Sequence, residues 1–178
     1  MTSTHQTLGE LLKDSETTIK EYSIFMIKNT DLDQDSDFKI MNKASERIKS
    51  FDDAKRLLTM GIHYRNSKNH IKKLVEIFST IKIEYEVWSA LLTYDDPWYL
   101  KVSEELETII IQRSFETVPI EEISTIYNYC FKKSTASRER MRIAISQANI
   151  PKEKWSIIGK ISSDAEIKKI SEEKISQT

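Results

Sequence analysis

The chain has 178 residues, with three glycines, three prolines and one cysteine, and its 27 basic and 28 acidic side chains give a net charge of −1. Glycine and proline together ordinarily make up about 12% of a chain, and sheet-rich folds need them at tight turns. Their scarcity predicts an all-α fold and disfavours a glycine-lined nucleotide site. The near-zero net charge gives no overall attraction to nucleic acid or to a membrane surface.

The same composition bears on the compartment. The single Cys130 has no partner for an internal disulfide, which favours a reducing, intracellular environment. No apolar run approaches the roughly 20 residues that a membrane span requires. The sequence therefore predicts a cytoplasmic (intracellular) protein without a membrane span.

Apolar side chains recur every three or four residues along most of the chain, which predicts helices. Thr7 and Glu10 form a capping pair that begins a first helix, expected to run to about residue 29. The acidic segment 29–37 indicates an exposed connection, in which Asp37 caps the next helix. The remaining predicted helices span residues 38–51, 51–62, 67–94, 97–117, 120–131, 135–148 and 151–159, with a helical tail from 163.

The longest apolar stripe lies in residues 67–94, which are expected to form the central helix. The prediction is a single bundle of about six to eight helices in residues 1–162. Residues 163–178 form a separate helical tail with a narrow apolar stripe, so this tail is expected to pack loosely or to need a partner.

Few residue patterns point to catalysis or to metal binding. The alternating aspartates of 31–37 are spaced as in a calcium loop, but Ser36 and Asn42 occupy the positions that need glycine and glutamate. His70 is interpreted as an exposed residue near a helix start, and Cys130 as a buried apolar side chain. No catalytic residue, cofactor or metal ligand is therefore predicted.

Charge is unevenly distributed along the chain. Residues 94–126 carry 8 acidic and 2 basic side chains, whereas residues 127–160 carry 8 basic and 2 acidic ones. Basic side chains, with a tryptophan that could stack on a base, suit a phosphate backbone. The predicted polyanion-binding residues are Lys132, Lys133, Arg138, Arg140, Arg142, Lys154 and Trp155. The alternative is that the two blocks neutralise each other within the fold.

These features favour a non-enzymatic helical adaptor or accessory subunit that binds a protein partner, with nucleic acid as a second candidate partner. One alternative is a bundle with an internal pocket for a small molecule or cofactor, acting as a sensor or an enzyme. Its expected lining residues are Tyr85, Trp88, Trp98, Tyr99 and His63. Another alternative is a self-assembling structural subunit, and the sequence leaves the oligomeric state open.

Overall fold

The computed structural model describes residues 7–132 and 135–177, with only the backbone for 135–137. Every regular element in these residues is a helix, which confirms the all-α prediction. The described residues form eleven α-helices, so the expected bundle of six to eight helices is not matched. The chain divides into two compact units, Met1–Ile83 and Glu84–Thr178. None of the described helices is both long and apolar enough to cross a bilayer.

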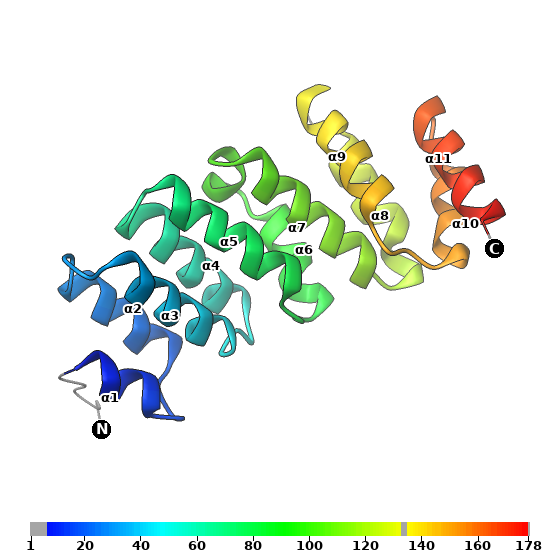
Figure 1. The fold of residues 1–178 in the computed structure, drawn as a ribbon. Helices are drawn as coiled ribbons and strands as arrows, with labels where there is room; N and C mark the ends of the chain where they lie inside the picture. Colours follow the sequence, from blue (N-terminus) through cyan, green and yellow to red (C-terminus); the bar gives the residue numbers. More distant parts are fainter. Residues whose placement is uncertain (1–6, 133–134, 178) are drawn as a thin grey trace. The chain divides into compact units, whose positions relative to one another are not determined.

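The first unit is a short stack of helices in two layers (Figure 1). Its most extensive contacts join helices that are one or two places apart in the chain, so α1, α3 and α5 form one layer and α2 and α4 the other. Its elements are α1 (Leu8–Lys13), α2 (Ile19–Lys28), α3 (Gln34–Ser45), α4 (Phe51–Thr59), a π-helical turn η1 (Met60–Tyr64) and α5 (Lys68–Thr80).

The first predicted helix is divided in two by a polar turn at residues 14–18. Thr18 ends this turn as the N-cap of α2. Its hydroxyl accepts from the Glu21 backbone N–H, and the Glu21 carboxylate accepts from the Thr18 backbone N–H. Serine, threonine and aspartate compete with the helix for backbone hydrogen bonds. The apolar stripe continues across the turn, which is why periodicity alone predicted one helix.

The second unit is also layered, with α7, α9 and α11 in one layer and α8 and α10 in the other, while α6 packs on α7 (Figure 1). Its elements are α6 (Tyr85–Thr93), a 3₁₀ turn η2 (Trp98–Lys101), α7 (Glu104–Thr117), a 3₁₀ turn η3 (Ile120–Glu122), α8 (Ile123–Phe131), α9 (Thr135–Gln147), α10 (Lys152–Ile161) and α11 (Ala165–Ser176).

The predicted central helix 67–94 is not continuous, because the chain is extended at residues 81–84 between α5 and α6. Thr80, Ile81 and Ile83 are β-branched, and such residues lose side-chain freedom in a helix. The break coincides with the boundary between the two compact units. The apolar stripe therefore spans two helices that belong to different units.

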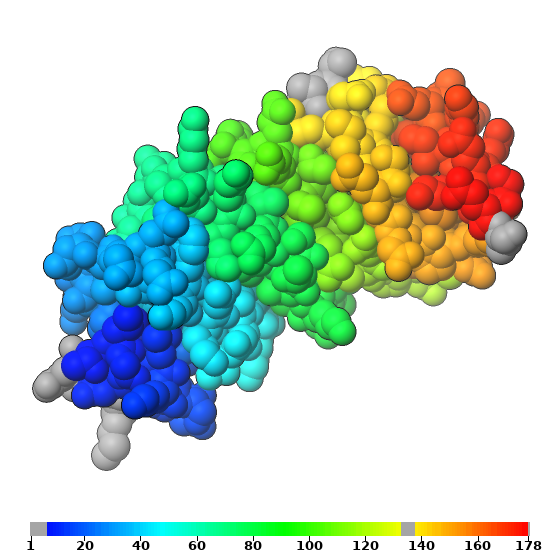
Figure 2. All heavy atoms as spheres, viewed as in Figure 1, coloured from blue at the N-terminus to red at the C-terminus, as the bar shows by residue number. Residues whose placement is uncertain are grey.

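The C-terminal tail is firmly packed, contrary to the prediction. α11 packs extensively against α10. Figure 2 shows the side chains of α10 (orange) and α11 (red) next to each other. Ile167 is fully buried, and the Ser171 hydroxyl donates to the Trp155 carbonyl at 2.7 Å. Gly159 allows this close approach, since a Cβ there would lie 2.6 Å from the Ser171 hydroxyl oxygen. The narrow stripe is sufficient because small residues line the contact.

Candidate functional site: a cationic groove in the first unit

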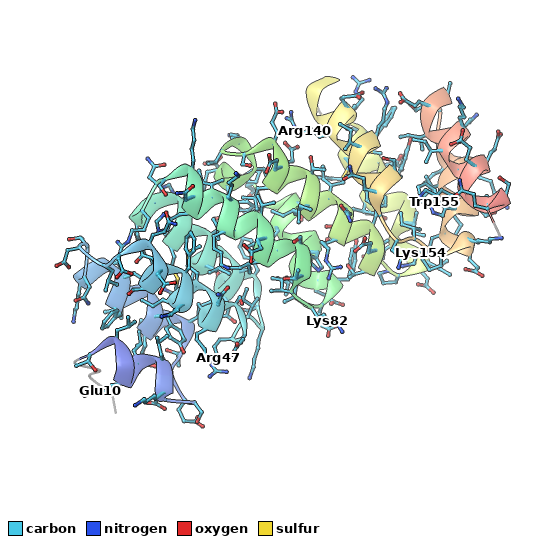
Figure 3. All side chains as sticks on the ribbon, in the orientation of Figure 1. Glu10, Arg47, Lys82, Arg140, Lys154 and Trp155 are labelled. Carbon is cyan, nitrogen blue, oxygen red and sulfur yellow. The ribbon has the colours of Figure 1, made fainter. Side chains whose placement is uncertain are left out.

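The arginines of the predicted polyanion-binding block lie on α9, and Arg140 is paired within the fold. Its Nε donates to Glu107 on α7 at 2.7 Å, and its Nη1 lies 3.4 Å from Glu104 (Figure 3). The Glu107 side chain is only 6% exposed, so Arg140 neutralises a buried carboxylate. Both glutamates belong to the acidic block 94–126, and Arg140 therefore supports the alternative of internal neutralisation.

Arg142 is paired on the opposite side of α9. Its Nη2 donates to Asp164 at 2.6 Å, and its Nη1 donates to Glu139 at 2.8 Å. Asp164 is also the N-cap of α11, where it accepts from the Ile167 backbone. The hydrogen bond from Arg142 holds the pKa of Asp164 below its ordinary value. Arg142 thus fixes the start of α11 against α9.

The other residues predicted to bind a polyanion differ in their burial and in their contacts. Trp155 is 1% exposed in the core of the second unit, so its ring is not accessible to a base (Figure 3). The Lys154 ammonium donates to the Glu116 carbonyl, and partial burial lowers the pKa of Lys154. Arg138 lies over the Phe131 ring at 5.5 Å, and Lys132 is exposed. Lys133 lies outside the described residues. The structure therefore does not bring these residues together as one row of available cations.

The residues proposed to line an internal pocket are packed as core or belong to different units. Trp88 and Tyr99 are fully buried, and the Tyr99 hydroxyl donates to the Leu91 carbonyl at 2.6 Å. Burial raises the pKa of Tyr99. Tyr85 is buried, and the Trp98 ring meets the Tyr99 ring edge-on. His63 is exposed and belongs to the first unit, whereas these aromatic residues belong to the second.

A buried polar network in the first unit was not predicted from the sequence. Asp37 on α3 is 1% exposed, and its Oδ2 accepts from Arg65 Nε at 2.8 Å and from His70 Nε2 at 2.9 Å. The Ser67 hydroxyl is hydrogen-bonded to His70 Nδ1, so both ring nitrogens of His70 have a partner. Arg65 also donates to the carbonyls of Met26 and Asn29. The network therefore joins α2, α3 and α5.

Two expectations are corrected by this network. His70 is buried at 6% exposure rather than exposed, and Asp37 is not the cap of α3, because Asp33 holds that position. The sequence did contain a signal that Asp37 is buried, since Asp37 shares a helical face with the buried Ile40 and Met41. A carboxylate on an apolar stripe indicates a buried pair, whereas the surrounding acidic segment suggested exposure. Burial of this kind requires a partner cation.

A groove of about 540 Å³ lies in the first unit, where the α1–α2 turn meets the α3–α4 connection. It is lined by residues 15–20 together with Glu46, Arg47, Lys49, Asp53 and Arg56. Arg47 is held at this position because its Nε donates to the Thr17 carbonyl at 3.2 Å and its Nη2 donates to the Ser15 carbonyl at 2.9 Å (Figure 3).

The two arginines of this groove differ from Arg65, Arg140 and Arg142 in their carboxylate partners. Among the described residues, Arg47 and Arg56 have no carboxylate within ion-pair distance, whereas Arg65, Arg140 and Arg142 each have at least one. Lys20 and Lys49 add two exposed ammonium groups.

Two of the three carboxylates that line the groove have partners other than its arginines. Asp53 accepts from the backbone of Lys49 and Ser50, where it completes the capping box of α4. Glu46 lies 3.5 Å from the ammonium of Lys43, which is outside the groove lining. The groove therefore presents two arginines that have no carboxylate partner among the described residues.

The ionisable side chains that line the groove are four cations and three carboxylates, with no histidine or cysteine. Within the described part of the chain, no three metal-ligating side chains are gathered in one place. No family model, curated protein or solved structure matches the chain. Function therefore has to be inferred from the side chains that each unit places together.

Proposed function

We propose that this protein is a non-enzymatic helical adaptor that binds an acidic segment of another protein through the groove of its first unit. The observation that carries the proposal is that Arg47 and Arg56, the two arginines described above as lacking a carboxylate partner, line the same groove. Guanidinium groups are suited to carboxylates and phosphates because their donors match these oxyanions in pairs.

The layered helix arrangement of each unit supports this proposal. Scaffolds in which helices pack mainly on their neighbours in the chain bind partners along the surfaces that the layers expose. The two units have this pattern of contacts. An adaptor of this kind needs no cofactor and no reacting group.

A protein segment fits the groove better than a nucleic acid backbone does. The lining includes Glu16, Glu46 and Asp53 beside its four cations, so its net formal charge is only +1. A continuous phosphodiester chain requires a row of cations and is repelled by interspersed carboxylates. A few acidic side chains can instead contact the arginines and avoid the glutamates.

The test is binding of a fluorescein-labelled peptide rich in aspartate and glutamate, followed by anisotropy across a salt series. We expect affinity that falls with salt and that drops about tenfold in Arg56→Glu, because an attraction is replaced by a repulsion. Lys68→Glu is the matched control, since Lys68 is exposed on α5 and outside the groove lining.

Two results would overturn the proposal. Equal losses in Arg56→Glu and Lys68→Glu would show that the peptide responds to overall charge and not to the groove. Tighter binding of single-stranded RNA, weakened by Lys132→Glu at an exposed position, would instead support the nucleic-acid hypothesis for the 132–160 block.

A further inference from the structure

We infer that the groove recognises a phosphate monoester, such as phosphoserine or phosphothreonine, on the acidic segment of the partner. This inference rests on the proposed function and names the chemical group that the two arginines bind. It depends on how Arg47 is held, on which of its donors remain available and on the hydroxyl groups beside it.

Arg47 is preorganised for an oxyanion. Its Nε and one Nη2 hydrogen donate to the Thr17 and Ser15 carbonyls, which fixes the guanidinium plane against the α1–α2 turn. The end formed by Nη1 and the second Nη2 hydrogen has no described partner. This end is a two-donor fork that matches two oxygens of one phosphate. Because the fork is already immobilised, less side-chain entropy is lost when a ligand binds.

The surroundings of the fork favour phosphate over a single carboxylate. A phosphate monoester carries a charge of about −1.5 to −2 at pH 7 and has three acceptor oxygens. Arg56, Lys20 and Lys49 offer three further cations, and the exposed Ser15 contributes a hydroxyl. A carboxylate has two oxygens and one charge, so it engages fewer of these donors at once.

The carboxylates in the lining also give selectivity. Glu16 and Glu46 lie beside the cations, so a ligand has to concentrate its negative charge on one small group. A phosphate on a short side chain does this, whereas an extended polyanion places charge against the glutamates. The groove therefore discriminates by charge density.

The experiment compares two peptides that differ only in one group, a serine or a phosphoserine between aspartates. Binding of each to the full chain is measured by isothermal titration calorimetry. We expect the phosphopeptide to bind about tenfold more tightly, the size of effect produced by one to three additional charge-assisted hydrogen bonds. Inorganic phosphate, followed through the Arg47 Nε–H signal in a ¹⁵N-labelled sample, should compete with the phosphopeptide.

The variants separate charge from geometry. Arg47→Lys keeps the charge but removes the fork, and it should reduce the preference for phosphoserine to about twofold or less. Arg47 also donates to two backbone carbonyls, so replacing it can disturb the fold. Arg56→Gln is therefore the second variant, because the Arg56 side chain is exposed on α4. It should weaken phosphopeptide binding about fivefold with an unchanged helical spectrum. Lys68→Gln is the control and should leave both affinities unchanged.

The outcomes distinguish this inference from the proposed function. Equal affinity for the two peptides, with both lost in Arg56→Glu, would overturn the phosphate inference and leave the acidic-segment adaptor intact. An unchanged phosphoserine preference in both Arg47→Lys and Arg56→Gln would place phosphate recognition outside the groove and overturn the inference. Absence of binding by either peptide at low salt would overturn both proposals.

Discussion

Replacing Arg140 with alanine is expected to destabilise the second unit strongly. The substitution leaves the Glu107 carboxylate, which is 6% exposed, without the guanidinium that lies 2.7 Å from it. Removing one partner of a buried ion pair costs about 3–5 kcal/mol, because the other charge stays buried and unpaired. The Arg140 side chain is itself 20% exposed, so water can partly replace it and the lower end, about 3 kcal/mol, applies.

Urea unfolding followed by tryptophan fluorescence measures this loss for the second unit. All three tryptophans, Trp88, Trp98 and Trp155, lie in that unit, so the signal does not report on the first. With an m-value of about 1.5 kcal/mol/M for a unit of this size, the loss shifts the midpoint by about 2 M.

Two control variants identify the cause. Lys132→Ala removes an exposed cation next to α9 and should change stability by no more than about 0.5 kcal/mol. Arg140→Met combined with Glu107→Leu replaces the pair with apolar side chains and should recover most of the loss. A midpoint for Arg140→Ala within error of the parent would refute the internal pairing, and Arg140 would then be available to an external polyanion.

Three further variants test other parts of the structure. Asp37→Asn should destabilise the first unit by about 3 kcal/mol, measured by far-ultraviolet circular dichroism, because it removes the carboxylate charge that balances a buried guanidinium. Gly61→Ala should cost about 1–3 kcal/mol in the same assay, because its Cβ would lie 2.6 Å from a Leu74 methyl group. For Asp164, Arg142 lowers the folded-state pKa, so its stabilisation is present at neutral pH and is lost as the pH falls from about 4. Asp164→Asn should therefore weaken the dependence of the urea midpoint on acid pH.

Each of these variants has an outcome that contradicts its premise. Full stability of Asp37→Asn would mean that the buried network is not formed in solution. A stabilised Gly61→Ala protein would show that the π-helical turn has room for a methyl group. If Asp164→Asn and the parent lose stability in parallel between pH 5 and pH 2, the Arg142 pair does not contribute to acid sensitivity.

Local signals in the sequence predicted helix starts well. Thr7 caps α1 and Ser50 caps α4 through hydroxyl groups that accept from the backbone three residues later. Such contacts depend on neighbours within one helical turn, and the sequence shows these neighbours directly. The all-α class follows from the same local information together with the shortage of glycine and proline.

Helix ends inside a continuous apolar stripe were not predicted. The spacing of apolar residues does not show where one part of the stripe stops packing against one core and the next part begins to pack against another. The stripe through 67–94 is unbroken in sequence, yet it covers the core of the first unit up to Phe78 and that of the second unit from Tyr85. The three β-branched residues at 80–83 were the available signal. The low helix propensity of these residues is a weak effect in isolation. It interrupts the helix here because the two ends of the stripe pack in different units.

The candidate site was beyond prediction because a count of charge along the chain does not show which charges the fold pairs. The block 127–160 has a net charge of +6, but Arg140 and Arg142 are committed to carboxylates on α7 and at the start of α11. Residues 46–56 contain four basic and three acidic side chains and therefore look neutral. Here the capping box of α4 and Lys43 engage two of the carboxylates, and Arg47 and Arg56 have no carboxylate partner among the described residues. The capacity to bind an anion thus depends on the charge that the fold leaves unpaired, and the two arginines of the groove lie in a segment whose net formal charge is only +1.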